Sequence, residues 1–232
     1  MAILQPEKEQ FKAYGAGEDR RARERFNKSI PPIFSDAKEK STDAIIEVLN
    51  NRKYLKMVDN KKRARAIARD PKMKQIDGYI KQAGNRSLTA IYSNLDPHYL
   101  EEAPMAMKHL YPELDRVLGS FNASLTEKES NNLKSQPIEG RTYAEWIQIN
   151  INNYVTQWES SFRRIMSQNV TTDGYTSRDT QLITSIRKLL NTFESRVRTL
   201  FMDAMNNVSR QALYDLQEAI HPGSQVGSPF TP

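Results

Sequence analysis

The feature that most constrains the fold is the stretch from Thr142 to Ala219, which has the pattern of two long helices separated by one break. Apolar residues recur at steps of three and four on both sides of the break, the spacing that places side chains on one helical face. The break, at Asn169 to Ser177, is rich in Thr, Ser, Asp and Gly, which favour turns and caps. The stretch therefore predicts a long antiparallel helical hairpin that buries an apolar stripe.

The ends of the two predicted arms carry recognisable signals. Thr142-Tyr143-Ala144-Glu145 is a capping box, in which the Thr hydroxyl and the Glu carboxylate each accept from a free backbone N–H at a helix start. Thr176 or Ser177 is the candidate N-cap of the second arm. That arm contains no Pro or Gly before Pro222-Gly223, so at 1.5 Å per residue it spans roughly 60 Å. A helix of that length indicates a bundle or a coiled pair.

Apolar stripes of this kind usually form the core between helices. The alternative is that one stripe faces another subunit, and Trp146, which lies off the main stripe, is the residue that would report such an interface. The candidate residues for hairpin packing or a subunit interface are Trp146, Trp158, Phe162, Phe193, Val197 and Leu200.

The composition agrees with an all-α chain. Hydrophobic residues make up 38% of the 232 positions, mean hydropathy is −0.71 and only 9 glycines occur, which predicts an elongated helical bundle with a thin core. The absence of cysteine excludes disulfides and thiolate metal sites and favours a cytoplasmic origin. No apolar run is long enough for a transmembrane helix, and residues 1–34 lack the apolar core of a signal peptide. We therefore expect no membrane partner.

Four regions follow from the distribution of Pro, Gly and charge. Residues 1–34 form a polar N-terminal arm that Pro31-Pro32 would end, and residues 35–135 form a basic region of shorter helices. Within this region Asp70-Pro71 predicts a break, and Gly84-Asn85 is a candidate helix stop. Residues 136–220 contain the long hairpin, and residues 221–232 form an extended C-terminal tail.

Positive charge is concentrated before the hairpin. Residues 1–86 hold 21 Lys and Arg against 12 Asp and Glu, whereas residues 87–232 hold 13 against 16. From Arg52 to Lys74 there are ten basic residues and two acidic ones. The candidate contacts for nucleic acid or an acidic partner are Arg52, Lys53, Lys56, Lys61, Lys62, Arg63, Arg65 and Arg69.

This basic cluster has three interpretations. Such runs most often form a solvated helix face. The second interpretation is contact with DNA phosphates, and the third is an acidic protein surface. No base-reading motif accompanies the cluster, so DNA binding through it would be non-specific and strongly salt-dependent.

Nothing in the sequence indicates an enzyme. Phosphate-binding glycine loops, nucleophile-elbow motifs and His-Glu-x-x-His are absent. The three histidines, His98, His109 and His221, have no partner at metal-ligand spacing. Asp96-Pro97-His98 and Glu101-Glu102 fit a loop cap and a solvated helix face better than an acid–base pair, because catalysis needs converging groups in a pocket. We expect no cofactor.

The second arm carries a resemblance to a known family. Ala204-Met205-Asn206-Asn207-Val208-Ser209-Arg210-Gln211-Ala212, followed by Tyr214, resembles a helix of tailed-phage minor head proteins, the head-morphogenesis relatives of the F protein of phage Mu. Gly140, Trp146 and Arg163-Arg164 are similar to the preceding amphipathic helix of that family, and Thr171 to Arg178 takes the place of its Gly-containing turn.

The resemblance covers about residues 140–216, with two departures. The family commonly has an Arg-Thr pair where this chain has Met202-Asp203, although Arg198-Thr199 lies one turn earlier. The family usually continues into a Cys-containing β-rich segment, which does not follow here.

The resemblance implies a structural virion protein of the portal vertex, which binds portal protein and other virion proteins as a homo-oligomer and contacts packaged double-stranded DNA. It would reside in the virion, at the head or head–tail junction, and in the host cytoplasm during assembly. The first alternative is a head-to-tail adaptor ring under the portal, with residues 1–34 and 221–232 as docking arms. The second alternative is a cytoplasmic helical DNA-binding protein, for which the basic cluster is the only support.

Overall fold

The computed structural model describes residues 8–97, 137–138, 141–169 and 175–220. The helices are α1 (Lys8–Leu49), α2 (Arg52–Leu55), α3 (Asn60–Ala68), α4 (Pro71–Pro97), α8 (Tyr143–Asn169) and α9 (Tyr175–Ile220). The strands β1 (Pro137–Ile138) and β2 (Arg141–Thr142) form one short antiparallel pair, with Pro137 opposite Thr142. The chain is an all-α bundle, which confirms the predicted fold class.

The chain divides into two compact units whose boundaries fall inside the long helices. Unit 1 comprises residues 1–28, 89–148 and 199–232, and unit 2 comprises residues 29–88 and 149–198. Segments distant in sequence thus share a unit, because each long helix carries an apolar stripe that needs partners from other helices. The sequence-based division into contiguous regions stays a prediction.

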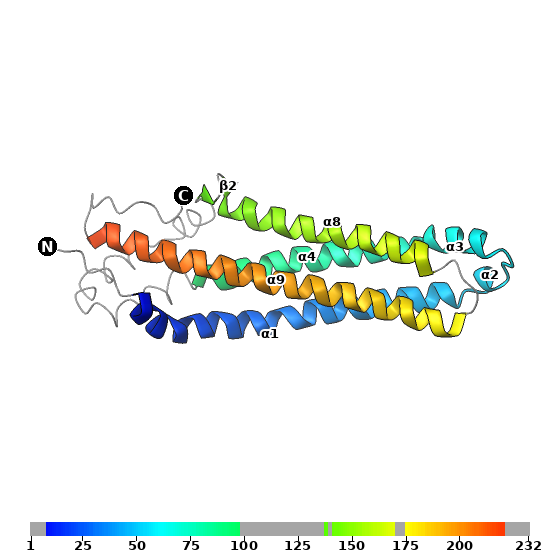
Figure 1. The fold of residues 1–232 in the computed structure, drawn as a ribbon, viewed down its shortest axis with the longest axis horizontal. Helices are drawn as coiled ribbons and strands as arrows, with labels where there is room; N and C mark the ends of the chain where they lie inside the picture. The colour runs from blue at the N-terminus through cyan, green and yellow to red at the C-terminus, as the bar shows by residue number, and fades with distance from the viewer. Residues whose placement is uncertain (1–7, 98–136, 139–140, 170–174, 221–232) are drawn as a thin grey trace. The chain divides into compact units, whose positions relative to one another are not determined.

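In unit 2, segments of α1, α4, α8 and α9 pack as an up-down-up-down four-helix bundle (Figure 1). Facing residues show the antiparallel order of neighbouring helices. Asp36 pairs with Arg86 and Glu47 with Lys72 between α1 and α4, while Lys81 pairs with Glu159 between α4 and α8.

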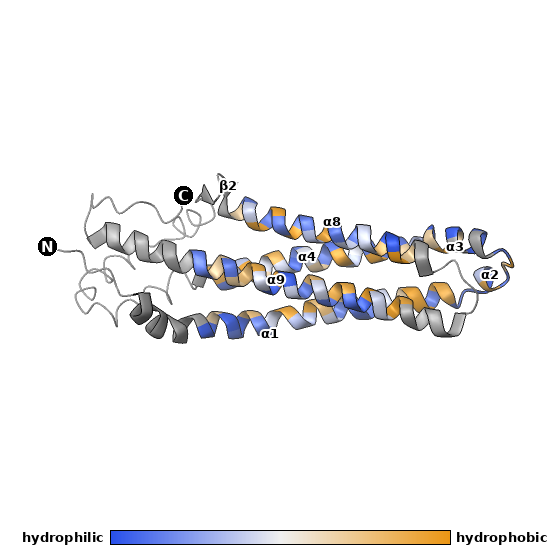
Figure 2. Ribbon diagram, viewed as in Figure 1, coloured by the Kyte–Doolittle hydropathy of each residue, from blue (hydrophilic) through white to orange (hydrophobic). Residues whose placement is uncertain are grey.

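Aromatic contacts join the remaining pairs of neighbouring helices in this bundle. The rings of Phe34 and Phe193 meet edge to face at 5.3 Å between α1 and α9, and those of Tyr154 and Phe193 at 6.2 Å between α8 and α9. Apolar and polar residues alternate along each long helix (Figure 2), as expected when one face of a helix is buried and the other meets water. The core of unit 2 is therefore a shared interior to which all four long helices contribute.

The described part of unit 1 has a smaller core. The rings of Phe26 and Phe201 stack with centroids 3.8 Å apart, joining α1 to α9. The hydroxyl of Tyr92 donates to the carbonyl of Ala144 at 3.1 Å, joining α4 to the start of α8. The buried apolar residues of unit 1 are Ala22, Phe26, Ala90, Ile91, Leu95, Ile147, Leu200, Phe201, Ala204 and Met205.

The hairpin agrees closely with its sequence signals. Helix α8 begins directly after Thr142, as the capping box predicts, and α9 ends at Ile220, just before Pro222-Gly223. The predicted N-cap of the second arm is two or three residues too late, since α9 already begins at Tyr175 and Thr176 and Ser177 lie inside it. The predicted break at Asp70-Pro71 is confirmed, because α3 ends at Ala68 and α4 begins at Pro71.

The predicted break at Pro31-Pro32 is wrong. Helix α1 continues through both prolines, so residues 8–34 belong to a helix rather than to an extended arm. Each proline removes one backbone hydrogen bond, a cost of about 3 kcal/mol. The prolines are exposed, whereas Ile30, Ile33 and Phe34 beside them are buried, and burying each such side chain contributes about 1.5–3 kcal/mol. Packing therefore outweighs the local preference.

The predicted helix stop at Gly84-Asn85 is also wrong, because α4 passes through it without interruption. Gly84 is buried, and a Cβ built there would lie 3.1 Å from Val155 Cγ2 and 3.3 Å from Ile151 Cγ2. The glycine lets α4 approach α8 closely, a use of glycine that has nothing to do with helix ends. The other predicted short helices and the C-terminal tail lie outside the described residues.

Candidate functional site: the basic tip

We use the name basic tip for residues 50–74 of unit 2, which connect α1 to α4 through α2 and α3 (Figure 1). Side-chain caps fix both short helices. Asn51 Oδ1 accepts from the backbone N–H of Lys53 at 3.0 Å, and Asp59 Oδ1 accepts from that of Lys62 at 3.1 Å. These are the N-cap interactions that Asn and Asp favour, and they explain why helices of four and nine residues form here.

Tyr54 anchors the basic tip to the bundle. Its side chain is buried, and its hydroxyl donates to Asp70 Oδ2 at 2.6 Å. The other carboxylate oxygen of Asp70 accepts from the backbone N–H of Lys72 at 2.8 Å, at the start of α4. The hydrogen bond to Asp70, burial and the charge of that carboxylate together raise the pKa of Tyr54 to about 12. Ile67 of α3 is fully buried as a second anchor.

The predicted contact residues gather on the outside of this anchored segment. Arg63 is half-buried, and Lys61 lies in the first turn of α3 with its side chain outside the described residues. The exposed members of the predicted set are Arg52, Lys53, Lys56, Lys62, Arg65 and Arg69.

The two acidic residues of the basic tip make hydrogen bonds within the tip. Asp59 caps α3 and lies 4.0 Å from the ammonium group of Lys62, while Asp70 is held by Tyr54 and the start of α4. Lys72 pairs with Glu47 of α1.

The remaining cations have no such neutralisation. Within the described part of the chain, no carboxylate forms an ion pair with Arg52, Lys56, Arg65 or Arg69. Lys53 lies over the ring of Tyr54, with its ammonium group 5.6 Å from the ring centroid. Among the residues that the structure describes, the basic tip therefore presents a positive surface without paired carboxylates at these four cations.

Two apolar side chains interrupt this positive surface. Val58 is 96% exposed and Leu55 is 49% exposed, and only Ile46 joins them as an exposed large hydrophobic residue among the residues described. The sequence predicts Leu55 on the apolar stripe of a helix over residues 35–58, which is wrong because α1 ends at Leu49. Val58 was missed, because an isolated Val in a polar stretch carries no periodic signal.

The predicted hairpin residues lie mainly in the interior. Trp146, at the start of α8, is partly exposed. The buried members of that set are Trp158, Phe162, Phe193, Val197 and Leu200. Their assignment to a subunit interface stays a prediction.

Neither a metal-binding cluster nor a membrane-spanning stretch occurs in the described ranges. Those ranges hold no group of three or more His, Cys, Asp or Glu that could bind a metal ion. None of the helices described contains a stretch apolar and long enough to cross a membrane. His98, His109, His221 and Glu101-Glu102 lie outside the described residues.

Comparison with known proteins adds no further constraint: no family model, curated protein or solved structure matches this chain. The class of protein that the fold and the site define is a helical bundle that presents a basic surface.

Proposed function

We propose that this chain is a structural virion protein of the portal vertex that contacts packaged DNA through its basic tip. The DNA contact rests on one observation, the exposed cations Arg52, Lys56, Arg65 and Arg69, which pair with no carboxylate among the described residues. The virion setting rests on the resemblance of residues 140–216 to minor head proteins.

Charge geometry supports phosphate contact over a purely solvated face. A solvated face usually mixes both signs, which screens its own potential. Here ten basic residues face only two acidic ones, Asp59 and Asp70, so the tip keeps a net positive field. The anchored helices fix where the cations lie, which lowers the entropy lost when they bind an extended polyanion.

The DNA contact is tested by titrating the full chain with a short duplex at increasing salt. If about five phosphates are contacted, the slope of log K against log salt is about −4.5. Changing Lys56, Arg65 and Arg69 together to Gln should reduce the magnitude of that slope by about 3. The control changes Lys28, Arg187 and Lys188 to Gln, an equal charge change at exposed positions outside the basic tip.

Equal weakening by both triple variants would contradict a local DNA site, and binding that is independent of salt would contradict phosphate contact altogether. The virion setting has a separate test, which is mass spectrometry of purified virions and procapsids. Absence from both removes the portal-vertex proposal, and DNA binding would then favour the cytoplasmic alternative. A ring of fixed stoichiometry on isolated portal protein, seen by native mass spectrometry, would favour the adaptor alternative.

An acidic protein surface, such as one on the portal protein, is the second candidate partner for the basic tip. The exposed Val58 and Leu55 favour it, because phosphate contact makes no use of apolar side chains. Replacing both with Ser should leave DNA affinity within about twofold if the cations alone bind DNA. Loss of portal binding in the same variant would assign the tip to a protein partner.

A further inference from the structure

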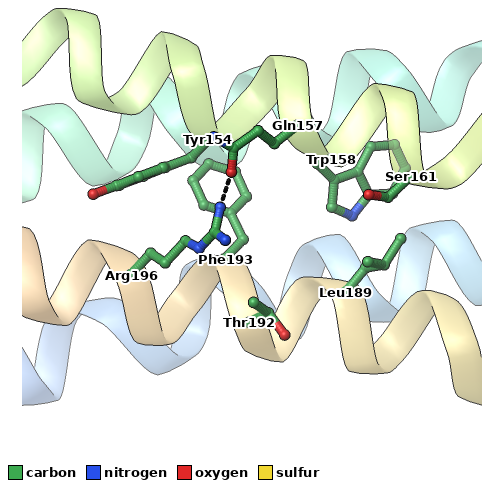
Figure 3. Close-up of a pocket in the computed structure, with 8 residues that line it drawn as sticks. All are labelled: Tyr154, Gln157, Trp158, Ser161, Leu189, Thr192, Phe193 and Arg196. Carbon is green, nitrogen blue, oxygen red and sulfur yellow. Dashed lines mark hydrogen bonds between the residues drawn. The ribbon is translucent and has the colours of Figure 1, made fainter.

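A groove lies between α8 and α9 within unit 2 (Figure 3). Its volume is about 110 Å³, and its walls mix aromatic, polar and cationic side chains. Helix α8 contributes Tyr154, Gln157, Trp158 and Ser161, and helix α9 contributes Leu189, Thr192, Phe193 and Arg196. The groove is distant in sequence from the basic tip and shares no residue with it.

The groove contains an unsatisfied hydrogen-bond donor. Trp158 is 3% exposed, and its indole Nε1 is buried without a hydrogen-bond partner. Figure 3 shows this nitrogen turned from α8 toward the α9 side of the groove. Indole nitrogen can only donate, and buried donors in folded proteins are nearly always paired. An acceptor that enters the groove would satisfy this donor.

Arg196 of α9 provides a positive charge in the groove, and contacts with neighbouring side chains fix its position. One guanidinium N–H of Arg196 donates to Gln157 Oε1, and the same guanidinium lies 5.6 Å from the centre of the Tyr154 ring. A guanidinium has five N–H donors in a planar fork, so Gln157 leaves donors for a second acceptor. Its hydrogen bond to Gln157 and its position over the Tyr154 ring fix it in the groove that Trp158 also lines (Figure 3).

None of the residues that line the groove carries a negative charge that could pair with Arg196. The two carboxylates next to the lining in sequence belong to other contacts. Glu159 pairs with Lys81 of α4 at 3.4 Å, and Glu194 binds Lys38 of α1 at 3.0 Å and Arg198 at 2.9 Å. The groove therefore combines a net positive charge with a free donor.

We propose that this groove binds a small monocarboxylate. One carboxylate oxygen accepts from Trp158 Nε1–H, the other accepts from Arg196, and the hydrocarbon body packs against Phe193 and Leu189. A closed cavity of 150 Å³ accommodates the six carbons of benzene, so a groove of about 110 Å³ that is open to solvent suits a chain of at most about six non-hydrogen atoms. Butyrate has that size, and butyramide is a neutral control of the same shape.

The test is a titration of the full ¹⁵N-labelled chain with sodium butyrate at constant ionic strength. The chain has two tryptophans, so the spectrum contains two indole N–H signals, and the Trp146→Phe variant assigns that of Trp158. We expect a saturable downfield shift of the Trp158 signal with a Kd on the order of 1 mM. Butyramide should give no saturation in the same range.

Two variants locate the carboxylate. Arg196→Gln removes the charge and should weaken butyrate binding about tenfold. The matched control is Arg187→Gln on the same helix, an exposed arginine outside the groove, which should leave the Kd unchanged. A Trp158 signal that does not move, equal binding of butyramide, or equal effects of the two variants would each overturn the proposal. None of these outcomes depends on DNA or portal binding.

Discussion

The close approach of α4 to α8 at Gly84 gives the sharpest test of the packing in unit 2. Helix α4 contains two glycines in its interior, Gly78 and Gly84, so each can be replaced by Ala in the same helix. A Cβ at Gly78 would meet nothing within 4 Å. A Cβ at Gly84 would lie 3.1 Å from Val155, 3.3 Å from Ile151 and 3.7 Å from Phe193.

The two substitutions should therefore have different effects. Ala in place of Gly in a helix stabilises by about 0.5–1 kcal/mol, because the unfolded chain loses conformational freedom. Gly78→Ala should show that gain in full. Overpacking a filled interior costs about 1–3 kcal/mol, so Gly84→Ala should be about 1–2 kcal/mol less stable than Gly78→Ala. Gly84→Leu, which adds three more carbons, should be about 2–3 kcal/mol less stable than the wild type.

The assay is urea unfolding followed by circular dichroism at 222 nm for the wild type and the three variants. An unchanged m-value would show that the folded and unfolded states keep their compactness, so that midpoints report stability. The reasoning fails if Gly84→Ala stabilises as much as Gly78→Ala, since α4 and α8 would then have room for the methyl group. It fails equally if Gly84→Leu unfolds at the wild-type midpoint.

Three further predictions concern ionisable side chains. Tyr54→Phe should lower the free energy of unfolding by about 1–2 kcal/mol. Because its pKa is raised to about 12, the stabilisation by Tyr54 is present below pH 10 and lost toward pH 12, so raising the pH should destabilise the wild type more than this variant. Burial raises the pKa of Glu194, but hydrogen bonds from Arg198 and Lys38 outweigh it and hold that pKa below 4.5. The stabilisation of the folded state by ionised Glu194 is therefore lost as the pH falls below 4.5. Glu194→Gln should remove this acid dependence from the urea midpoints. Burial, and then the charge of Glu159, raise the pKa of Asp77, so ionised Asp77 opposes folding at neutral pH, and Asp77→Asn should raise the thermal midpoint at pH 7; a lower midpoint would contradict this.

The residues that sequence reasoning placed correctly are those whose signal lies within one helix. The stripe on the second arm contains Ile186, Leu190, Phe193, Val197 and Leu200, all buried in the structure. Their spacing needs no knowledge of a partner, because any helix with that pattern must hide the same face. The capping-box sequence at Thr142 is an equally local signal, since it involves residues of a single helical turn.

The N-terminal helix shows where a local rule misled. Ala22, Phe26, Ile30 and Ile33 are buried at steps of four, four and three, a helical period that was present in the sequence. The adjacent Pro31-Pro32 predicted a break, so this period was not interpreted as one continuous helix. Proline sets a cost for continuing a helix, but the comparison with what the helix gains by packing requires its partners.

The two candidate sites also differ in how much of each the sequence could predict. The ten basic residues of Arg52 to Lys74 were visible as a composition, but only the structure distinguishes exposed Arg65 and Arg69 from half-buried Arg63. The groove between α8 and α9 had no sequence signal, because its donor Trp158 and its cation Arg196 are 38 positions apart and belong to different helices.

The sequence by itself determined that this protein is all-α, where its hairpin begins and ends, and that its positive charge precedes the hairpin. These properties follow from periodicity, capping and composition, each of which acts over a few residues. Only the tertiary structure decided that a helix passes through Pro31-Pro32, that Gly84 lies against α8, and that Arg196 and Trp158 line the same groove. Those outcomes depend on which distant segments meet, and the energy of their contact outweighs the preference of any single residue.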